Sequence, residues 1–241
     1  MGWPSQRILD AMTWEAALDG HMFDLEDLPY FFDNDPRVRS DGDRYWLASS
    51  SFADLHDANE VQQEAGHVVE RINGAMRLQA DGFQGVRLGG RYRNENGEHV
   101  ILAVGSAVLR EKAGRVTLVG GTPAPRPVGP REYVHLSATD VAVADVLLIL
   151  GKGDLDWYDL WKVFEIIRMD VGGKRTMIVN GWASQSDLDA FGASANHPGV
   201  SGEAARHARR TERVPNQTIT IGQGRDFIAD LARSWMKSRL N

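Results

Sequence analysis

Apolar and polar positions along the chain follow two different periods. From residue 57 onward the apolar positions recur at helical spacing, and the Asp57-Ala58-Asn59-Glu60 stretch resembles a capping box that opens this helix. Residues 86–121 instead alternate as strands do, with turn sequences at Asn96-Gly97 and Ala113-Gly114. We therefore predict a helix that carries one apolar face, followed by an antiparallel meander of at least three strands. The residues of that apolar face are Val61, Ala65, Val68, Val69, Ile72, Ala75 and Met76.

The chain before this helix has a less regular pattern. Residues 44–52 have the composition of a strand, whereas residues 1–45 are acidic and predicted to be irregular. Large aromatic side chains in the irregular part are expected to anchor it onto a core, namely Trp3, Trp14, Phe23, Tyr30, Phe31 and Phe32. The first part of the protein is thus predicted to be an antiparallel β-meander with a packed helix.

Residues 121–130 contain four of the nine prolines, which favours an extended linker. We place a domain boundary near residue 130, with an α+β domain over 1–130 and a helical bundle over 131–241. The bundle is predicted to contain helices over about 138–150, from Asp154 or Asp156 to Gly172-Gly173, from Ser186 onward, and from Thr220 onward. Gln223 completes a capping box with Thr220.

Composition narrows the class of protein. The chain has no cysteine, which fits a reducing compartment, and Asp10, Glu15 and Asp19 interrupt the start where a signal peptide would be apolar. No apolar run is long enough to span a bilayer, so a cytoplasmic protein with no membrane contact is expected. The formal net charge is -6, so any contact with nucleic acid must be local.

The densest cluster of candidate chemistry lies in residues 203–213. On a helix, Arg206 and Arg210 would share one face beside His207, a layout that can hold a phosphate next to an imidazole. The imidazole can move protons near neutral pH, and a guanidinium can stabilise charge that develops on phosphorus. Arg209 and Arg213 add further positive charge. The alternative is a solvated basic helix with a Glu203–His207 pair.

Three further residues are weaker candidates. Glu165 lies where an apolar helix face meets solvent and is expected either to orient His207 or to form an ordinary surface pair with Lys162 or Arg168. Asn196 and His197 precede Pro198 and are expected either to contact RNA, with His197 as a second proton carrier, or to form a turn, which is the favoured role. The remaining histidines are scattered, so we predict no metal and no cofactor.

The stretch from Asp156 onward contains "LWKVFEII", "GWAS" and "SANHPGVSGEAARHA", followed by a closing helix with Trp235. It resembles uncharacterised bacterial helical domains that look like distant members of the HEPN superfamily, many of which cut RNA. The resemblance covers roughly the last hundred residues. It implies a homodimer whose two copies bring an Arg and a His together, without a metal, so that the 2′-hydroxyl of RNA attacks the adjacent phosphate.

The spacing of the family motif is not reproduced here. The family separates its Arg and His by four to six residues, whereas Arg206 and His207 are adjacent and would lie about 100° apart around a helix axis. The one formal match to the motif spacing, Arg93-Asn94 with His99, crosses the predicted Asn96-Gly97 hairpin and is attributed to chance.

Two functions are therefore expected. The first is a metal-independent endoribonuclease of a bacterial defence or toxin system, with Arg206, His207 and Glu165 as its centre. In that protein, RNA would also contact Arg209, Arg210, Arg213, Asn196 and His197. The second is a non-catalytic module that binds RNA or a protein partner, in which the helical bundle is structural.

Overall fold

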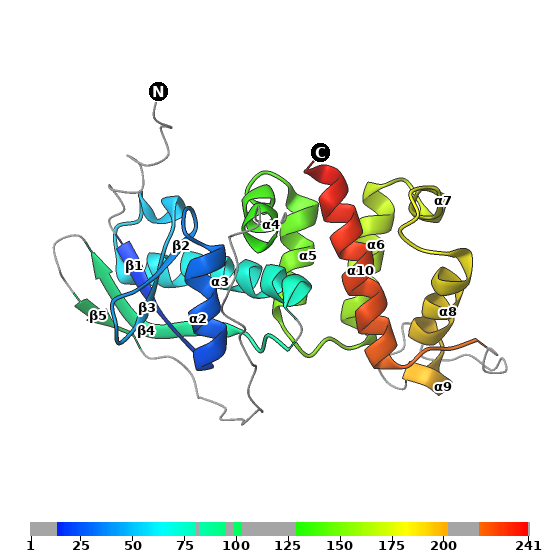
Figure 1. The fold of residues 1–241 in the computed structure, drawn as a ribbon, viewed down its shortest axis with the longest axis horizontal. Helices are drawn as coiled ribbons and strands as arrows, with labels where there is room; N and C mark the ends of the chain where they lie inside the picture. The colour runs from blue at the N-terminus through cyan, green and yellow to red at the C-terminus, as the bar shows by residue number, and fades with distance from the viewer. Residues whose placement is uncertain (1–13, 81, 95–98, 103–128, 202–216, 241) are drawn as a thin grey trace, which may run out of the picture.

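The computed structural model describes residues 14–80, 82–94, 99–102, 129–201 and 217–240. A sheet lies at one end of the molecule and helices α6 to α10 lie at the other, with α3 running between the two ends (Figure 1). The predicted α+β class, with a C-terminal helical part, is confirmed.

The sheet is antiparallel and has five strands in the order β2-β3-β1-β4-β5. Its strands are β1 (Trp14–Gly20), β2 (Arg37–Ser40), β3 (Tyr45–Ala48), β4 (Val86–Asn94) and β5 (His99–Ile101). The first strand in sequence is therefore the central strand. The predicted pairing across residues 95–98 is confirmed, because Arg93 of β4 lies opposite His99 of β5. The predicted strands after residue 102 lie outside the described residues.

The prediction that residues up to 45 are irregular is wrong for the described part of them. β1 occupies Trp14–Gly20, and helix α2 occupies Met22–Phe31. Trp14 and Phe32 are buried as expected, whereas Phe23 and Tyr30 are 41% and 55% exposed and do not anchor the segment. Trp3 lies outside the described residues. The predicted strand over 44–52 is shorter than expected, since a 3-10 helix, η1 (Ser50–Phe52), follows β3.

Helix α3 (Ala58–Gln79) covers one face of the sheet. Its predicted start is confirmed, because the Asp57 carboxylate accepts hydrogen bonds from the backbone N–H groups of Asn59 and Glu60. All seven apolar residues predicted for its inner face are buried. Glu60 accepts from the backbone N–H of His56 at 2.7 Å, one residue before the N-cap, so the reciprocal bond of the predicted capping box is displaced by one residue.

The helical part contains α4 (Pro130–Ser137), α5 (Val141–Gly151), α6 (Trp157–Asp170), α7 (Lys174–Val179), α8 (Gln185–Asn196), α9 (Pro198–Ser201) and α10 (Ile221–Arg239). The predicted N-caps Asp156 and Thr220 are confirmed, and Gln223 completes the capping box at Thr220. The start predicted at Ser186 is wrong by two residues, because Ser184 caps α8 in a capping box with Asp187. Helices α4, α7 and the short α9 were not predicted.

Helices α3 and α5 approach each other closely at two glycines. A Cβ built on Gly74 of α3 would lie 2.9 Å from the carbonyl carbon of Leu147, and one built on Gly151 would lie 3.0 Å from the carbonyl carbon of Glu70. Both distances are too short for a real Cβ contact with backbone. The two helix backbones can therefore reach this separation only because these two positions lack a side chain.

Arg77 joins the same helices to the loop before β4. Its guanidinium donates to the carbonyl oxygens of Leu150 and Gly151, which have no partner within α5, and to the carbonyl oxygen of Gln84 at 2.5 Å. Asp24 accepts from the backbone N–H groups of Gln84 and Gly85 on the other side of that loop. Burial lowers the pKa of Arg77 and the nearby Asp24 charge opposes this shift, but the guanidinium stays protonated.

The last helix is tied to the bundle at its C-terminal end. Arg239 pairs with Asp140, the N-cap of α5, and with Asp170 at the end of α6. The indole N–H of Trp235 donates to Asp170 at 2.8 Å. Three helices that are separate in sequence therefore meet at one partly buried group of charges.

Most of the buried apolar side chains of the described residues form one connected cluster, which extends from Trp14 in the sheet to Met236 in α10. The boundary near residue 130 stays a prediction. Among the described residues, no helix has both the length and the apolar character needed to cross a membrane.

Substitution of Gly74 by alanine should lower the free energy of unfolding by about 1–3 kcal/mol, because the new methyl group would force α3 away from the Leu147 backbone. The matched control is Gly66→Ala on the same helix, where a Cβ meets nothing within 4 Å. It should be neutral or stabilising by up to about 1 kcal/mol, since alanine favours helix. Urea unfolding of both variants measures the difference, and equal stability would contradict the proposed close packing.

Candidate arginine-bearing sheet face

The face of the sheet that points away from α3 carries mostly polar residues. Trp14, Ala16 and Leu18 of β1 belong to the apolar core, so Glu15, Ala17 and Asp19 point to the opposite side. The pairing register places Arg93 opposite Glu15, and Arg87 opposite Asp19. We call this side the outer face. It carries five arginines of the strands, which are Arg37, Arg39, Arg87, Arg91 and Arg93.

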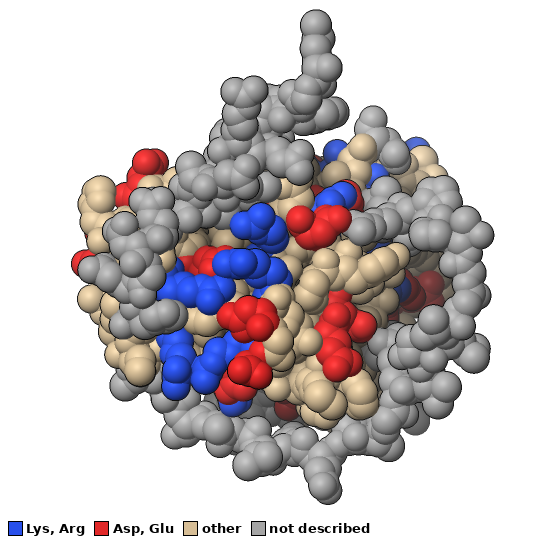
Figure 2. Space-filling model, turned by 60° about the vertical axis from the view of Figure 1, so that its left-hand side comes forward, with Lys and Arg blue, Asp and Glu red and all other residues tan. Residues whose placement is uncertain are grey.

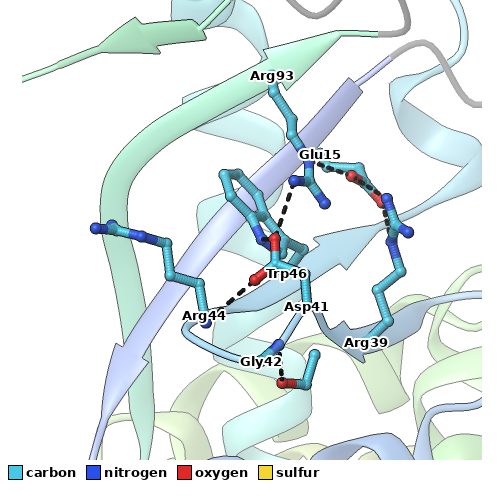
Figure 3. A network of polar contacts seen from close by, with 8 residues as sticks. Glu15, Arg39, Asp41, Gly42, Arg44, Trp46 and Arg93 are labelled. Atoms are coloured by element: carbon cyan, nitrogen blue, oxygen red, sulfur yellow. Dashed lines mark hydrogen bonds and ion pairs between the residues drawn. The ribbon is translucent and has the colours of Figure 1, made fainter.

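Glu15 is the centre of the polar network on this face (Figure 3). Its two carboxylate oxygens accept from Nε and Nη2 of Arg39 at 2.6 and 2.7 Å, and Oε2 also accepts from Nε of Arg93 at 2.6 Å. The Glu15 side chain is only 12% exposed. Burial by itself would raise the pKa of Glu15, but the hydrogen bonds and charges of the two arginines outweigh it and hold the pKa below its ordinary value.

Arg93 also binds the turn between β2 and β3. Its guanidinium carbon lies 3.7 Å from the centroid of the Trp46 ring, and its Nη1 donates to Asp41 at 3.1 Å. The indole N–H of Trp46 donates to the same Asp41 oxygen at 2.6 Å. Local desolvation opposes ionisation of Asp41, but the hydrogen bonds from Trp46, Arg93 and the Arg44 backbone together lower its pKa. Trp46 and Arg93 thereby hold the β2–β3 turn through Asp41.

Several guanidinium groups of the outer face remain open to solvent. The side chains of Arg39 and Arg87 are 51% and 44% exposed, and Arg91 is also exposed. Figure 2, turned so that the sheet end of the molecule comes forward, shows cationic side chains gathered there with acidic ones between them. The first lysine in the sequence is Lys112, so every described cation of this end is an arginine.

The residues predicted as a site in the bundle are only partly described. Arg206, His207, Arg209, Arg210 and Arg213 lie outside the described residues. Glu165 of α6 lies 3.9 Å from Arg168 in an i, i+3 ion pair, as the surface-pair alternative predicts.

Asn196 and His197 end helix α8. The Asn196 amide donates to the carbonyl oxygen of Gly192, and Nδ1 of buried His197 accepts from the backbone N–H of Gly199 at 3.1 Å. These contacts match the predicted turn-forming role. The RNA-contacting role predicted for both residues stays a prediction.

A hydrogen bond joins the end of α8 to the chain just before α10. The backbone N–H of Ile219, just before α10, donates to Oγ of Ser194 at 2.8 Å. Phe191 of α8 also contacts Trp157, Trp161 and Phe164 of α6 and Phe227 of α10. Helices α6, α8 and α10 are therefore held together by these contacts.

The described residues contain no group of three or more His, Cys, Asp or Glu side chains that could hold a metal ion. No protein-family model, curated protein or solved structure matches the chain. The resemblance to the HEPN superfamily therefore stays a prediction.

The outer face is not among the predicted sites, because the sequence pattern does not identify β1 as a strand. A signal was present, since Arg37 and Arg39, and likewise Arg91 and Arg93, alternate with apolar or aromatic residues at the period of a strand. Such alternation indicates a sheet with one charged side, but it does not indicate that Glu15 joins two of these arginines.

Replacement of Glu15 by glutamine should lower the free energy of unfolding by about 1–3 kcal/mol at neutral pH, because two guanidinium groups lose their shared carboxylate. The folded-state pKa of Glu15 is depressed, so its contribution is complete above the ordinary value of 4.5 and is lost as the pH falls through the folded-state pKa. Urea unfolding of the wild type and the variant from pH 7 to pH 3 measures this difference.

The control is Asp154→Asn, which removes a carboxylate that is 94% exposed and pairs with Arg225. This variant should change stability much less, because exposed ion pairs contribute little. A difference between wild type and Glu15→Gln that persists undiminished at pH 3 would show that the carboxylate charge is not responsible.

Proposed function

We propose that this protein binds RNA through the arginine-bearing outer face of its sheet, with the helical bundle as support. The observation that carries the proposal is the set of exposed guanidinium groups on one face of the sheet, where Arg39 of β2 and Arg87 and Arg91 of β4 reach solvent. Phosphate contacts of this kind supply most of the sequence-independent affinity for nucleic acid.

The type of cation favours RNA over an acidic protein partner. A guanidinium binds phosphate through two parallel N–H groups and also stacks on flat rings, which a lysine ammonium does not do. Arg93 already stacks on Trp46 in this structure. Unpaired RNA bases offer similar flat surfaces to arginine. We place this activity in the cytoplasm, because a chain without cysteine fits a reducing compartment.

The local charge makes the proposal compatible with the acidic chain. The strands contribute five arginines to the outer face against two acids, Glu15 and Asp19, and Asp41 adds a third acid from the β2–β3 turn. The face therefore carries an excess of positive charge although the formal net charge of the protein is -6. Attraction of RNA is expected at this face and not over the whole molecule.

A metal-independent ribonuclease centre in the bundle is a second candidate. It is favoured by the Ser194–Ile219 hydrogen bond, which joins the chain on both sides of the stretch that contains Arg206 and His207. In this proposal Glu165 orients His207, Arg206 binds the phosphate, and a homodimer assembles the centre. The outer face of the sheet would then hold the RNA that the bundle cuts.

RNA binding is tested with the double variant Arg87→Ala/Arg91→Ala and a fluorescein-labelled single-stranded RNA, measured by fluorescence anisotropy. Affinity at about 0.1 M salt should fall roughly tenfold, and the slope of log affinity against log salt should fall by about 1.4, or 0.7 for each lost phosphate contact. Arg175→Ala is the control, because Arg175 is exposed on α7 at the opposite end of the molecule (Figure 1). Equal affinity of the double variant and the wild type would refute the proposal, and equal binding of polyglutamate would indicate an acidic protein partner instead.

Ribonuclease activity is tested by incubating the protein with mixed RNA in the presence of EDTA. Cleavage should occur without metal and should disappear in His207→Ala, because the imidazole moves the proton during attack by the 2′-hydroxyl. The folded state of the variant is checked by its thermal unfolding. Cleavage that persists in folded His207→Ala, or the absence of any cleavage by the wild type, would remove the nuclease assignment.

A further inference from the structure

The guanidinium groups on the outer face fall into two kinds. Arg39 and Arg93 already bind carboxylates through the same paired N–H edges that would bind a phosphate. Arg91, and Arg44 of the β2–β3 turn, form no ion pair with any described residue, and Arg87 pairs through one Nη only, with Asp19. Arg37 is half-buried, and its Nε is enclosed without a hydrogen-bond partner among the described residues. A bound phosphate therefore has ready access to the second kind, but it must compete with Glu15 or Asp41 for the first.

This competition is uneven because the carboxylates belong to the chain. Glu15 is held on the central strand between its two arginines, and Asp41 is held by the Trp46 indole and the backbone N–H of Arg44 (Figure 3). Both acids are therefore already positioned, whereas an incoming phosphate must lose translational and rotational freedom when it binds. One isolated phosphate gains too few contacts to displace them. A strand with several linked phosphates reaches Arg44, Arg87 and Arg91 at the same time and raises its effective concentration at the paired arginines.

Resting on the proposed RNA binding, we propose that Glu15 and Asp41 act as built-in competitors that restrict the outer face to strands with several phosphates. Mononucleotides and inorganic phosphate bind weakly, because a single phosphate reaches one open guanidinium group or must displace a carboxylate at a paired one. The two acids thus set both the affinity of the face and the minimum length of the strand that it retains.

Asp41→Asn is the first test, because Asp41 is 38% exposed on a turn and its amide can still accept from Trp46. The probes are single-stranded RNAs of about 5, 10 and 15 nucleotides, and adenosine monophosphate, and binding is measured by anisotropy and calorimetry at several salt concentrations. The variant should bind the longer RNAs about three- to tenfold more tightly than the wild type, with a salt slope steeper by about 0.7. The shortest RNA should gain the most, relative to its affinity for the wild type.

Glu15→Gln is the second test, carried out well below its melting temperature, and it should shift RNA affinity in the same direction. Asp189→Asn is the matched control, since it removes one exposed negative charge from α8 at the other end of the molecule (Figure 1). This control should leave RNA affinity unchanged. If Asp189→Asn gained as much RNA affinity as Asp41→Asn, only the net charge of the protein would matter, and the proposal would be overturned.

The outcomes separate this inference from the proposed function. If the wild type binds RNA through Arg87 and Arg91, but folded Asp41→Asn and Glu15→Gln bind no more tightly, then RNA binding stands and the competitor role is wrong. If the wild type binds no RNA and both variants do, the competitor role stands and RNA binding by the natural protein is wrong. If none of them binds RNA, both proposals fail.

Discussion

The close approach of α3 and α5 holds the two ends of this protein together. Gly74 and Gly151 let the two backbones meet, and Arg77 binds the carbonyl oxygens that end α5. Because α3 covers the inner face of the sheet and also packs against α4, the position of the sheet relative to the bundle depends on how α3 contacts α4 and α5. Arg233 of α10 donates to the carbonyl oxygen of Leu78 at 2.7 Å and adds a second link at the same end of α3.

The outer face differs from the rest of the structure in how its charges are satisfied. In the bundle, charged side chains such as Arg239 and Asp170 are used between helices, where they fix packing. On the sheet, Glu15 binds two guanidinium groups of different exposure, because the Arg93 side chain is largely covered whereas the Arg39 side chain remains half exposed. A network that orders a cation and leaves it in solvent, as at Arg39, is suited to contact with another molecule, whereas a network between helices is suited to stability.

The elements that could be predicted from sequence are those whose signals are local. Asp57, Asp156 and Thr220 cap helices through backbone N–H groups two or three residues away, so their positions follow from short motifs. β1 was missed because its strand character depends on distant partners. Its sequence contains two alanines and two acids among seven residues and has a weak intrinsic preference for strands.

The candidate site was harder to predict than the fold for the same reason. Arg93 is 78 residues from Glu15 in sequence, and Arg39 is 24 residues from it, so only the register of the sheet brings the three together. Glu165, by contrast, pairs with Arg168 just as its spacing suggests. An ion pair between residues close in sequence can be predicted from their spacing. The Glu15 network cannot, because its three residues belong to three separate strands.

The central position of β1 also affects how the chain is made. Strand β1 is synthesised before β4, which completes one of its edges, and the Asp19–Arg87 pair spans 68 residues. At about 5–20 residues per second, synthesis leaves that edge open for roughly 3–14 s. During this interval the nascent chain exposes a strand whose backbone groups lack their neighbour. The acids at Glu15 and Asp19 then help to keep neighbouring nascent chains from pairing with it.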